Sequence, residues 1–171
     1  MSLEQASLVA QIVSAMAVIA SLVFVGFQLR SAAAAIRASS SQAHSSSYTQ
    51  LVASIIDNAD FAQIWATGIN DPNALREEEW VRFVAYSSAL FRLYESSRVQ
   101  WEHGRLDEEH WHTIEQQAAS FSHLPGVKAA WRVRGHWFTP SFRSWFEGLG
   151  FDGEPSVYAR GRGDAPGRVG E

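Results

Sequence analysis

An uninterrupted apolar segment near the N-terminus sets the strongest limit on what this chain can fold into. Residues 8–29, LVAQIVSAMAVIASLVFVGFQL, form a run of 22 residues without a charged side chain. At about 1.5 Å per residue, a helix of this length crosses a hydrocarbon core of about 30 Å. The segment therefore predicts a transmembrane helix.

Two other interpretations stay open, namely a cleaved export signal and a core helix of a soluble domain. An export signal has a basic start and a shorter apolar core, whereas Glu4 is the only charged residue before this segment. Residues 33–35, three alanines, do offer a small-x-small cleavage pattern. The length of the segment and its flanks favour an uncleaved membrane anchor.

The positive charges around the segment predict its orientation. Arg30 and Arg37 follow it, and no Lys or Arg precedes it. The positive-inside rule then places the N-terminus outside and the C-terminal body in the cytoplasm. The chain has no cysteine, which agrees with a reducing compartment and excludes disulfides, thiolate metal sites and a cysteine nucleophile.

Small and polar residues recur within the apolar segment, several of them at a spacing of seven. A second helix would explain this gathering, because small side chains allow close approach and Ser or Gln can form hydrogen bonds across the interface. The alternative is chance, since serine and alanine are tolerated anywhere in a span. The predicted helix-association seam consists of Ser7, Gln11, Ser14, Ala17, Ser21 and Gln28.

The rest of the chain predicts an all-α fold. Residues 30–47 are rich in alanine and serine and predict a solvated juxtamembrane stalk. Residues 48–150 show apolar side chains at helical spacing and no alternating strand pattern, so we expect a small cytoplasmic helical bundle. Residues 151–171 are rich in Gly, Pro and Arg and predict a disordered tail.

Local signals place the ends of several of these helices. A long helix is expected from about Glu77 to His103, with Gly104 ending it. Asp107 is a candidate N-cap for the next helix, and Thr139 with Pro140 predicts the start of the last one.

Charge and composition exclude some functions. The chain has 14 Lys and Arg against 18 Asp and Glu, a net charge of −4, so it has no global positive field to attract nucleic acid. A diiron bundle needs two Glu-x-x-His pairs and two more inward Glu residues, whereas only Glu109 and His112, with Glu108 beside them, fit. We therefore predict no metal site and no cofactor.

One charged cluster lies near the apolar face of the long helix. Glu95, Arg98 and Glu102 are spaced so that Arg98 can pair with either acid while partly buried. An acid/base role is the alternative, but no nucleophile, second histidine or Gly-rich loop accompanies these residues. The pattern favours a structural ion-pair network and a protein that is not an enzyme.

Residues 128–146 combine basic and aromatic side chains, which suit an interface with a partner or a membrane surface. The alternative is that the aromatic residues fill the bundle core while the basic residues face solvent. The interface candidates are Trp131, Arg132, Arg134, Trp137, Arg143 and Trp145.

Three stretches together resemble an uncharacterised proteobacterial family of small proteins with one N-terminal transmembrane helix and a helical cytoplasmic body. They are ASLVFVGFQLRSAAAAIRA, WEHGRLDEEHW and LPGVKAAWRVRGHWFTPSF, in this order. The resemblance covers most of residues 17–146 and implies the bacterial inner membrane as location and no catalytic role. Family members often carry longer side chains where this chain has SSSQAHSSS, so the resemblance does not imply a continuous stalk helix.

These observations predict a single-pass membrane protein that acts as a non-catalytic interaction or accessory subunit of a membrane complex. Its expected partners are the lipid bilayer and another transmembrane helix, either a second copy or a subunit of the complex, and not nucleic acid. A metal-binding or enzymatic bundle using Glu95, Arg98, Glu102, Glu109 and His112 is one alternative. A membrane-anchored regulatory sensor that binds a ligand in its aromatic bundle is the other.

Overall fold

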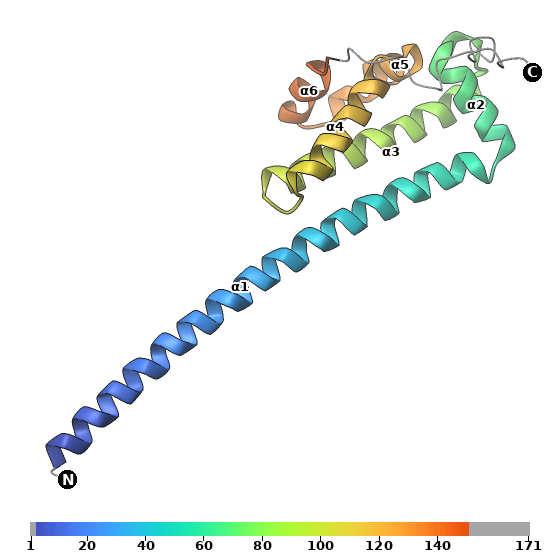
Figure 1. Ribbon diagram of the computed structural model, residues 1–171. Helices are drawn as coiled ribbons and strands as arrows, with labels where there is room; N and C mark the ends of the chain where they lie inside the picture. Colours follow the sequence, from blue (N-terminus) through green and yellow to red (C-terminus); the bar gives the residue numbers. More distant parts are fainter. Residues whose placement is uncertain (1–2, 151–171) are drawn as a thin grey trace, which may run out of the picture. The chain divides into compact units, whose positions relative to one another are not determined.

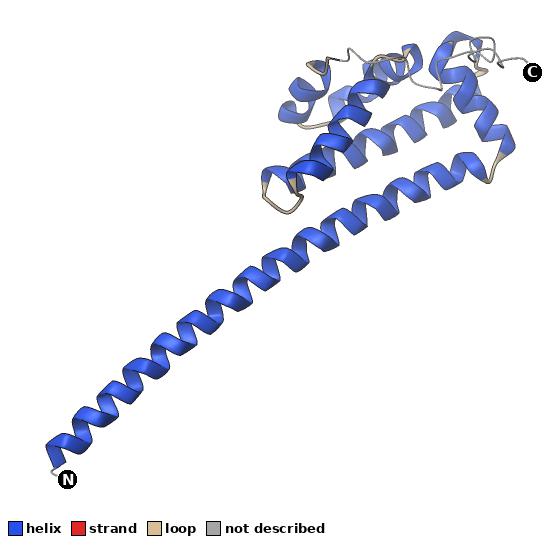
Figure 2. Cartoon of the chain, viewed as in Figure 1, coloured by secondary structure: helices blue, strands red, loops and turns tan. Residues whose placement is uncertain are grey.

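The computed structural model describes residues 3–150, and every regular element in this part of the chain is helical (Figures 1 and 2). The all-α prediction is therefore confirmed. The predicted tail, residues 151–171, lies outside the described residues. The elements are α1 Leu3–Ile56, α2 Ala59–Asn70, the 3-10 turn η1 Pro72–Ala74, α3 Glu77–Glu102, α4 Glu108–Ser122, α5 Pro125–Arg134, the 3-10 turn η2 Gly135–Trp137 and α6 Pro140–Glu147.

The chain divides into two compact units, Met1–Ser39 and Ser40–Glu171. In the first unit, Leu8 and the large apolar side chains of α1 from Ile12 to Leu29 are exposed. In the part of the chain that the structure describes, Gln11–Ile56 is the one helix long and apolar enough to cross a membrane. An exposed apolar helix of this length has no core to enter within its own unit, which favours lipid or another helix as its surroundings.

The predicted stalk differs from the structure in its second half. Helix α1 covers the whole serine run, and the second unit begins at Ser40 rather than at Tyr48. Residues at positions 41, 44, 48, 51 and 55 are half-buried, and this spacing of three or four puts them on one side of the helix. Packing of this stripe overrides the weak helix propensity of serine.

Local signals fix the ends of the helices in the second unit. The side chain of Asn58 accepts a hydrogen bond from the Phe61 N–H at 2.9 Å, and Asp107 accepts one from the His110 N–H at 3.0 Å. Gly104, with φ +65°, follows α3 and allows the Arg105 N–H to reach the Gln100 carbonyl at 2.8 Å. The expected ends at Gly104, Asp107 and Thr139 are confirmed.

Helix α3 supplies the centre of an aromatic core. Phe83, Phe91 and Tyr94 on α3 are fully buried. The Phe91 ring packs edge-on against the rings of Trp131, Phe138 and Phe146, with centroids 5.1, 6.0 and 5.2 Å away. These contacts hold α5, Phe138 and α6 against α3 and so position the basic residues of α5.

Helices α2 and α5 meet at two glycines. A Cβ atom on Gly126 would lie 1.8 Å from the backbone oxygen of Gly68, and one on Gly68 would lie 2.5 Å from the Phe83 ring. Only glycine permits so close an approach of the two backbones. This crossing fixes the position of α5 in the bundle.

Candidate functional site

The predicted seam residues lie on the surface of α1. Ser7, Gln11, Ser14, Ala17, Ser21 and Gln28 are all exposed. At about 100° per residue they fall within an arc of about 120°, which also carries Val18 and Val25. Large side chains of Ile12, Met16, Ile19, Val23 and Phe27 occupy the opposite side of the helix.

One seam hydroxyl is already partly satisfied within the helix. The Ser21 Oγ donates to the Ala17 carbonyl at 2.8 Å, so its lone pairs stay available to a donor on a neighbouring helix. Such back-bonding lets a serine sit in an apolar span without an unpaired donor. The seam is therefore compatible with both a lipid-facing and a helix-facing state.

The predicted ion-pair cluster is only partly brought together. Arg98 pairs with Glu102 through Nε at 2.8 Å. Glu95 instead pairs with Arg92 at 2.6 Å and accepts hydrogen bonds from the Thr139 N–H at 2.9 Å and Oγ at 3.0 Å. Because Glu95 is buried and both of its carboxylate oxygens are engaged, it ties α3 to the start of α6.

The candidate metal ligands do not converge. Glu108 accepts a hydrogen bond from the Trp101 indole at 2.9 Å, while His112 lies 3.0 Å from the Gln116 amide. Glu108, Glu109 and His112 are all exposed. Over residues 3–150, no group of three or more His, Cys, Asp or Glu is arranged to hold a metal ion.

The six interface candidates separate into inward and outward groups. Trp131 donates its indole N–H to Glu147 at 3.1 Å, and Trp145 donates to Glu115 at 3.0 Å. Both rings, together with Arg143, are half-buried against the core, as the core interpretation of these residues expects. Arg132 and Trp137 are exposed, and the Arg134 guanidinium lies 4.0 Å from the centre of the Trp137 ring.

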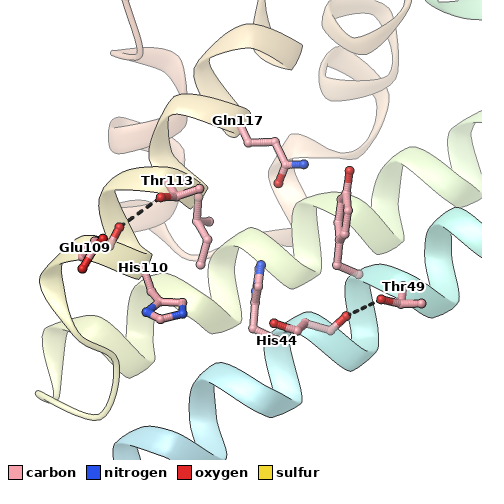
Figure 3. Close-up of a pocket in the computed structure, with 9 residues that line it drawn as sticks. His44, Thr49, Glu109, His110, Thr113 and Gln117 are labelled. Carbon is pink, nitrogen blue, oxygen red and sulfur yellow. Dashed lines mark hydrogen bonds between the residues drawn. The ribbon is translucent and has the colours of Figure 1, made fainter.

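A groove that the sequence did not predict lies within the second unit, between the end of α1 and α4. It has a volume of about 540 Å³. Figure 3 shows the side chains of His44 and His110 extending into this space from the two helices. Its other lining residues are Ser45, Tyr48, Thr49, Glu109, Thr113, Ile114 and Gln117.

His44 is held by a buried serine on α3. The Ser97 hydroxyl donates to the Leu93 carbonyl at 2.9 Å, so it accepts from the His44 Nδ1 at 2.6 Å. The neutral ring therefore carries its proton on Nδ1 and presents Nε2 as an acceptor. Burial, and to a lesser extent the electrostatic effect of nearby His110, lower the pKa of His44 and favour this neutral form.

The same geometry decides what the groove can do chemically. Ser97 is buried and gives its proton to a backbone carbonyl, so His44 does not activate it as a nucleophile. The Asp107 carboxylate lies 2.8 Å from the ring Nδ1 of His110 and holds this ring in place. The pKa of Asp107 is lowered, mainly by the hydrogen bond that its carboxylate accepts from the His110 backbone N–H. The groove offers hydrogen-bonding groups around an apolar floor, which suits binding rather than bond cleavage.

Comparisons with models of protein families, with curated proteins and with solved structures find no match for this chain.

Proposed function

We propose that this chain is a single-pass membrane protein whose helical body acts as a non-catalytic interaction or accessory subunit of a membrane complex. The observation that carries the proposal is the two-sided surface of α1 between Ser7 and Gln28. Large apolar side chains occupy one side, and small or hydrogen-bonding side chains, with Val18 and Val25 among them, gather on the other. Lipid tails give no reason for this separation, whereas a second transmembrane helix does.

The contacts of the second unit support a role in binding rather than catalysis. Glu95 is engaged with Arg92 and Thr139, and the Ser97 hydroxyl is engaged with a backbone carbonyl. The strongest charged cluster and the most buried serine–histidine contact therefore serve the fold. In this proposal the N-terminus lies outside, the body lies in the cytoplasm, and the membrane is the bacterial inner membrane.

Substitution of seam serines by leucine tests this function. The tagged full-length wild type and the variants Ser14→Leu and Ser21→Leu are each extracted from native membranes in lipid nanodiscs. Each is co-expressed with a second, differently tagged copy of the chain. The yields of this second copy and of any other co-extracted chain are then quantified. We expect insertion to be kept and the yield of the associated chain to fall roughly 3- to 30-fold, as for loss of close packing and hydrogen bonding between spans.

Ala20→Leu is the matched control, because it adds similar bulk outside the seam, on the part of the helix that also carries Phe27. It should leave the yield of the associated chain unchanged. Equal yields from all four proteins would contradict the seam. A loss with Ala20→Leu as large as with Ser14→Leu would show that bulk anywhere in the span, rather than the seam, decides association.

A further inference from the structure

Basic charge is concentrated on one segment of an acidic protein. Between Leu124 and Phe146 the chain has four basic residues and no acidic residue, while its net charge is −4. Lys128, Arg132 and Arg134 lie on α5. Such segregation creates a local positive field that the net charge conceals.

The outward side of this segment also exposes apolar side chains. Trp137 is 54% exposed and Val133 is 43% exposed, although each belongs to a residue type that usually enters a core. Lys128 and Arg132 are one helical turn apart, so their charges border the same strip of surface. We call Lys128, Arg132, Val133, Arg134 and Trp137 the α5 surface.

Acidic residues in the described part of the chain do not neutralise the cations of the α5 surface. Over residues 3–150, none of Lys128, Arg132 and Arg134 forms an ion pair. Glu147 lines a hollow of about 390 Å³ with Lys128 and Arg132, and its carboxylate accepts from the Trp131 indole. Glu77 borders the other side of Arg132. Among the residues that the structure describes, three cations therefore face two nearby acids, which leaves this part of the surface with a positive balance.

We infer that the α5 surface docks on anionic phospholipid headgroups of the membrane that holds the chain, an inference that rests on the proposed anchoring by α1. Tryptophan rings settle at the headgroup level of a bilayer, and lysine and arginine bind the phosphates beside them. Arg134, stacked on Trp137, can keep its ring contact while its outer N–H groups face a phosphate.

Two features favour a bilayer over a protein partner. The exposed apolar part consists of Val133 and Trp137 alone, whereas a stable protein interface buries about 800 Å² on each partner. The proposed span ends at Leu29 and the second unit begins at Ser40, so only the ten residues 30–39 connect the span to the body. A weak surface attraction then suffices, because a body already attached to the bilayer meets its headgroups at a high effective concentration.

The absence of cysteine allows a site-specific test with the full-length chain. Val133→Cys is labelled with an environment-sensitive fluorophore, and the protein is placed in nanodiscs of phosphatidylcholine with or without 30% phosphatidylglycerol. Val81→Cys is the matched control. Val81 is also an exposed valine on a helix, with 61% of its surface exposed, but it lies on α3 near acidic residues and not on the α5 surface. Emission and quenching by neutral acrylamide report contact with lipid.

We expect blue-shifted emission and protection from acrylamide at position 133 in anionic discs only, with position 81 accessible in both. In Lys128→Gln/Arg132→Gln/Arg134→Gln the ratio of docked to undocked body should fall on the order of 100-fold, since each basic residue near the surface contributes about fivefold. High salt should produce a similar loss.

The outcomes separate the two proposals. Failure of the chain to co-migrate with the discs would overturn anchoring, and docking would fall with it. If the chain co-migrates with the discs but acrylamide quenches the label at position 133 equally in neutral and anionic discs, docking alone would be overturned. Protection of this label from acrylamide in the triple variant would also overturn docking alone. Protection in native membranes but not in anionic discs would also overturn it and identify a protein as the occupant.

Discussion

Gly126 lets α5 approach α2 at a distance that no other residue type permits. A Cβ atom here would lie 1.8 Å from the Gly68 backbone oxygen, which cannot swing away as a side chain can. We predict that Gly126→Ala lowers the free energy of unfolding by about 1–3 kcal/mol, the range for overpacked sites. Urea denaturation followed by tryptophan fluorescence in detergent measures this change.

Gly150→Ala is the control, because a Cβ atom there meets nothing within 4 Å. It should leave the denaturation midpoint in place. If Gly126→Ala were as stable as Gly150→Ala, α5 would have to be free to shift away from α2, and the tight crossing described above would be wrong.

His44 predicts how the stability of the second unit depends on pH. Its pKa is lowered from 6.5 by burial and by His110, so the unfolded chain binds the proton more tightly than the folded one. The stabilisation is therefore complete above pH 6.5 and is lost as the pH falls through the lower folded value. The groups that face the ring are Tyr48, Ser97, Glu109, His110 and Asp107 behind His110.

His44→Asn tests this assignment, because an asparagine amide can still donate to Ser97 but does not titrate. We expect the denaturation midpoint of the wild type to fall below pH 6.5 more steeply than that of His44→Asn. The measurement is a series of urea titrations between pH 7.5 and 5. His136→Asn, at an exposed histidine, should keep the wild-type slope, and a wild-type slope in His44→Asn would contradict the prediction.

At the scale of elements, the features that could be predicted from the sequence are those with local causes. Gly104, Asp107 and Thr139 act on backbone groups within a few residues, so their patterns suffice to place helix ends. The same is true of the apolar length of α1, which depends on composition alone.

The features that could not be predicted depend on residues far apart in the chain. His44 lies in a serine run without an apolar pattern, and its partner Ser97 is 53 residues away. Glu95 has an arginine within one turn on either side, and the sequence pattern suggested Arg98. The structure selects Arg92, because Thr139 at the start of α6 fixes the other carboxylate oxygen.

Helix α1 shows how the two kinds of cause combine in one element. Its first part is helical because, in apolar surroundings, the backbone N–H and C=O groups find no water, and a helix pairs them with one another. Its last part is helical although serine-rich, because Leu51 and Ile55 pack against the aromatic core. The predicted break between stalk and bundle was misplaced, since packing and not propensity decides where the folded body begins.

At the scale of the whole molecule, the proposed orientation rests on two arginines. Single cysteines at Gln5 and His103, labelled in intact cells with an impermeant maleimide, report the two sides of the membrane. We expect Gln5→Cys to be labelled from outside and His103→Cys only after permeabilisation. Labelling of both positions from outside would contradict a cytoplasmic body, and loss of the Gln5 label from the mature chain would indicate a cleaved signal.

Moving the charges should reverse this pattern, because Lys and Arg close to the ends of a span decide which end is retained in the cytoplasm. Gln5→Lys combined with Arg30→Gln and Arg37→Gln transfers the positive flank to the N-terminal side of α1. In this background His103→Cys should become the position labelled from outside in most molecules, whereas Gln5→Lys alone should give a mixture of both orientations. An unchanged pattern would mean that the folded body, and not the flanking arginines, determines topology. The same result decides whether the α5 surface can reach the anionic cytoplasmic leaflet, since only a body in the cytoplasm faces this leaflet.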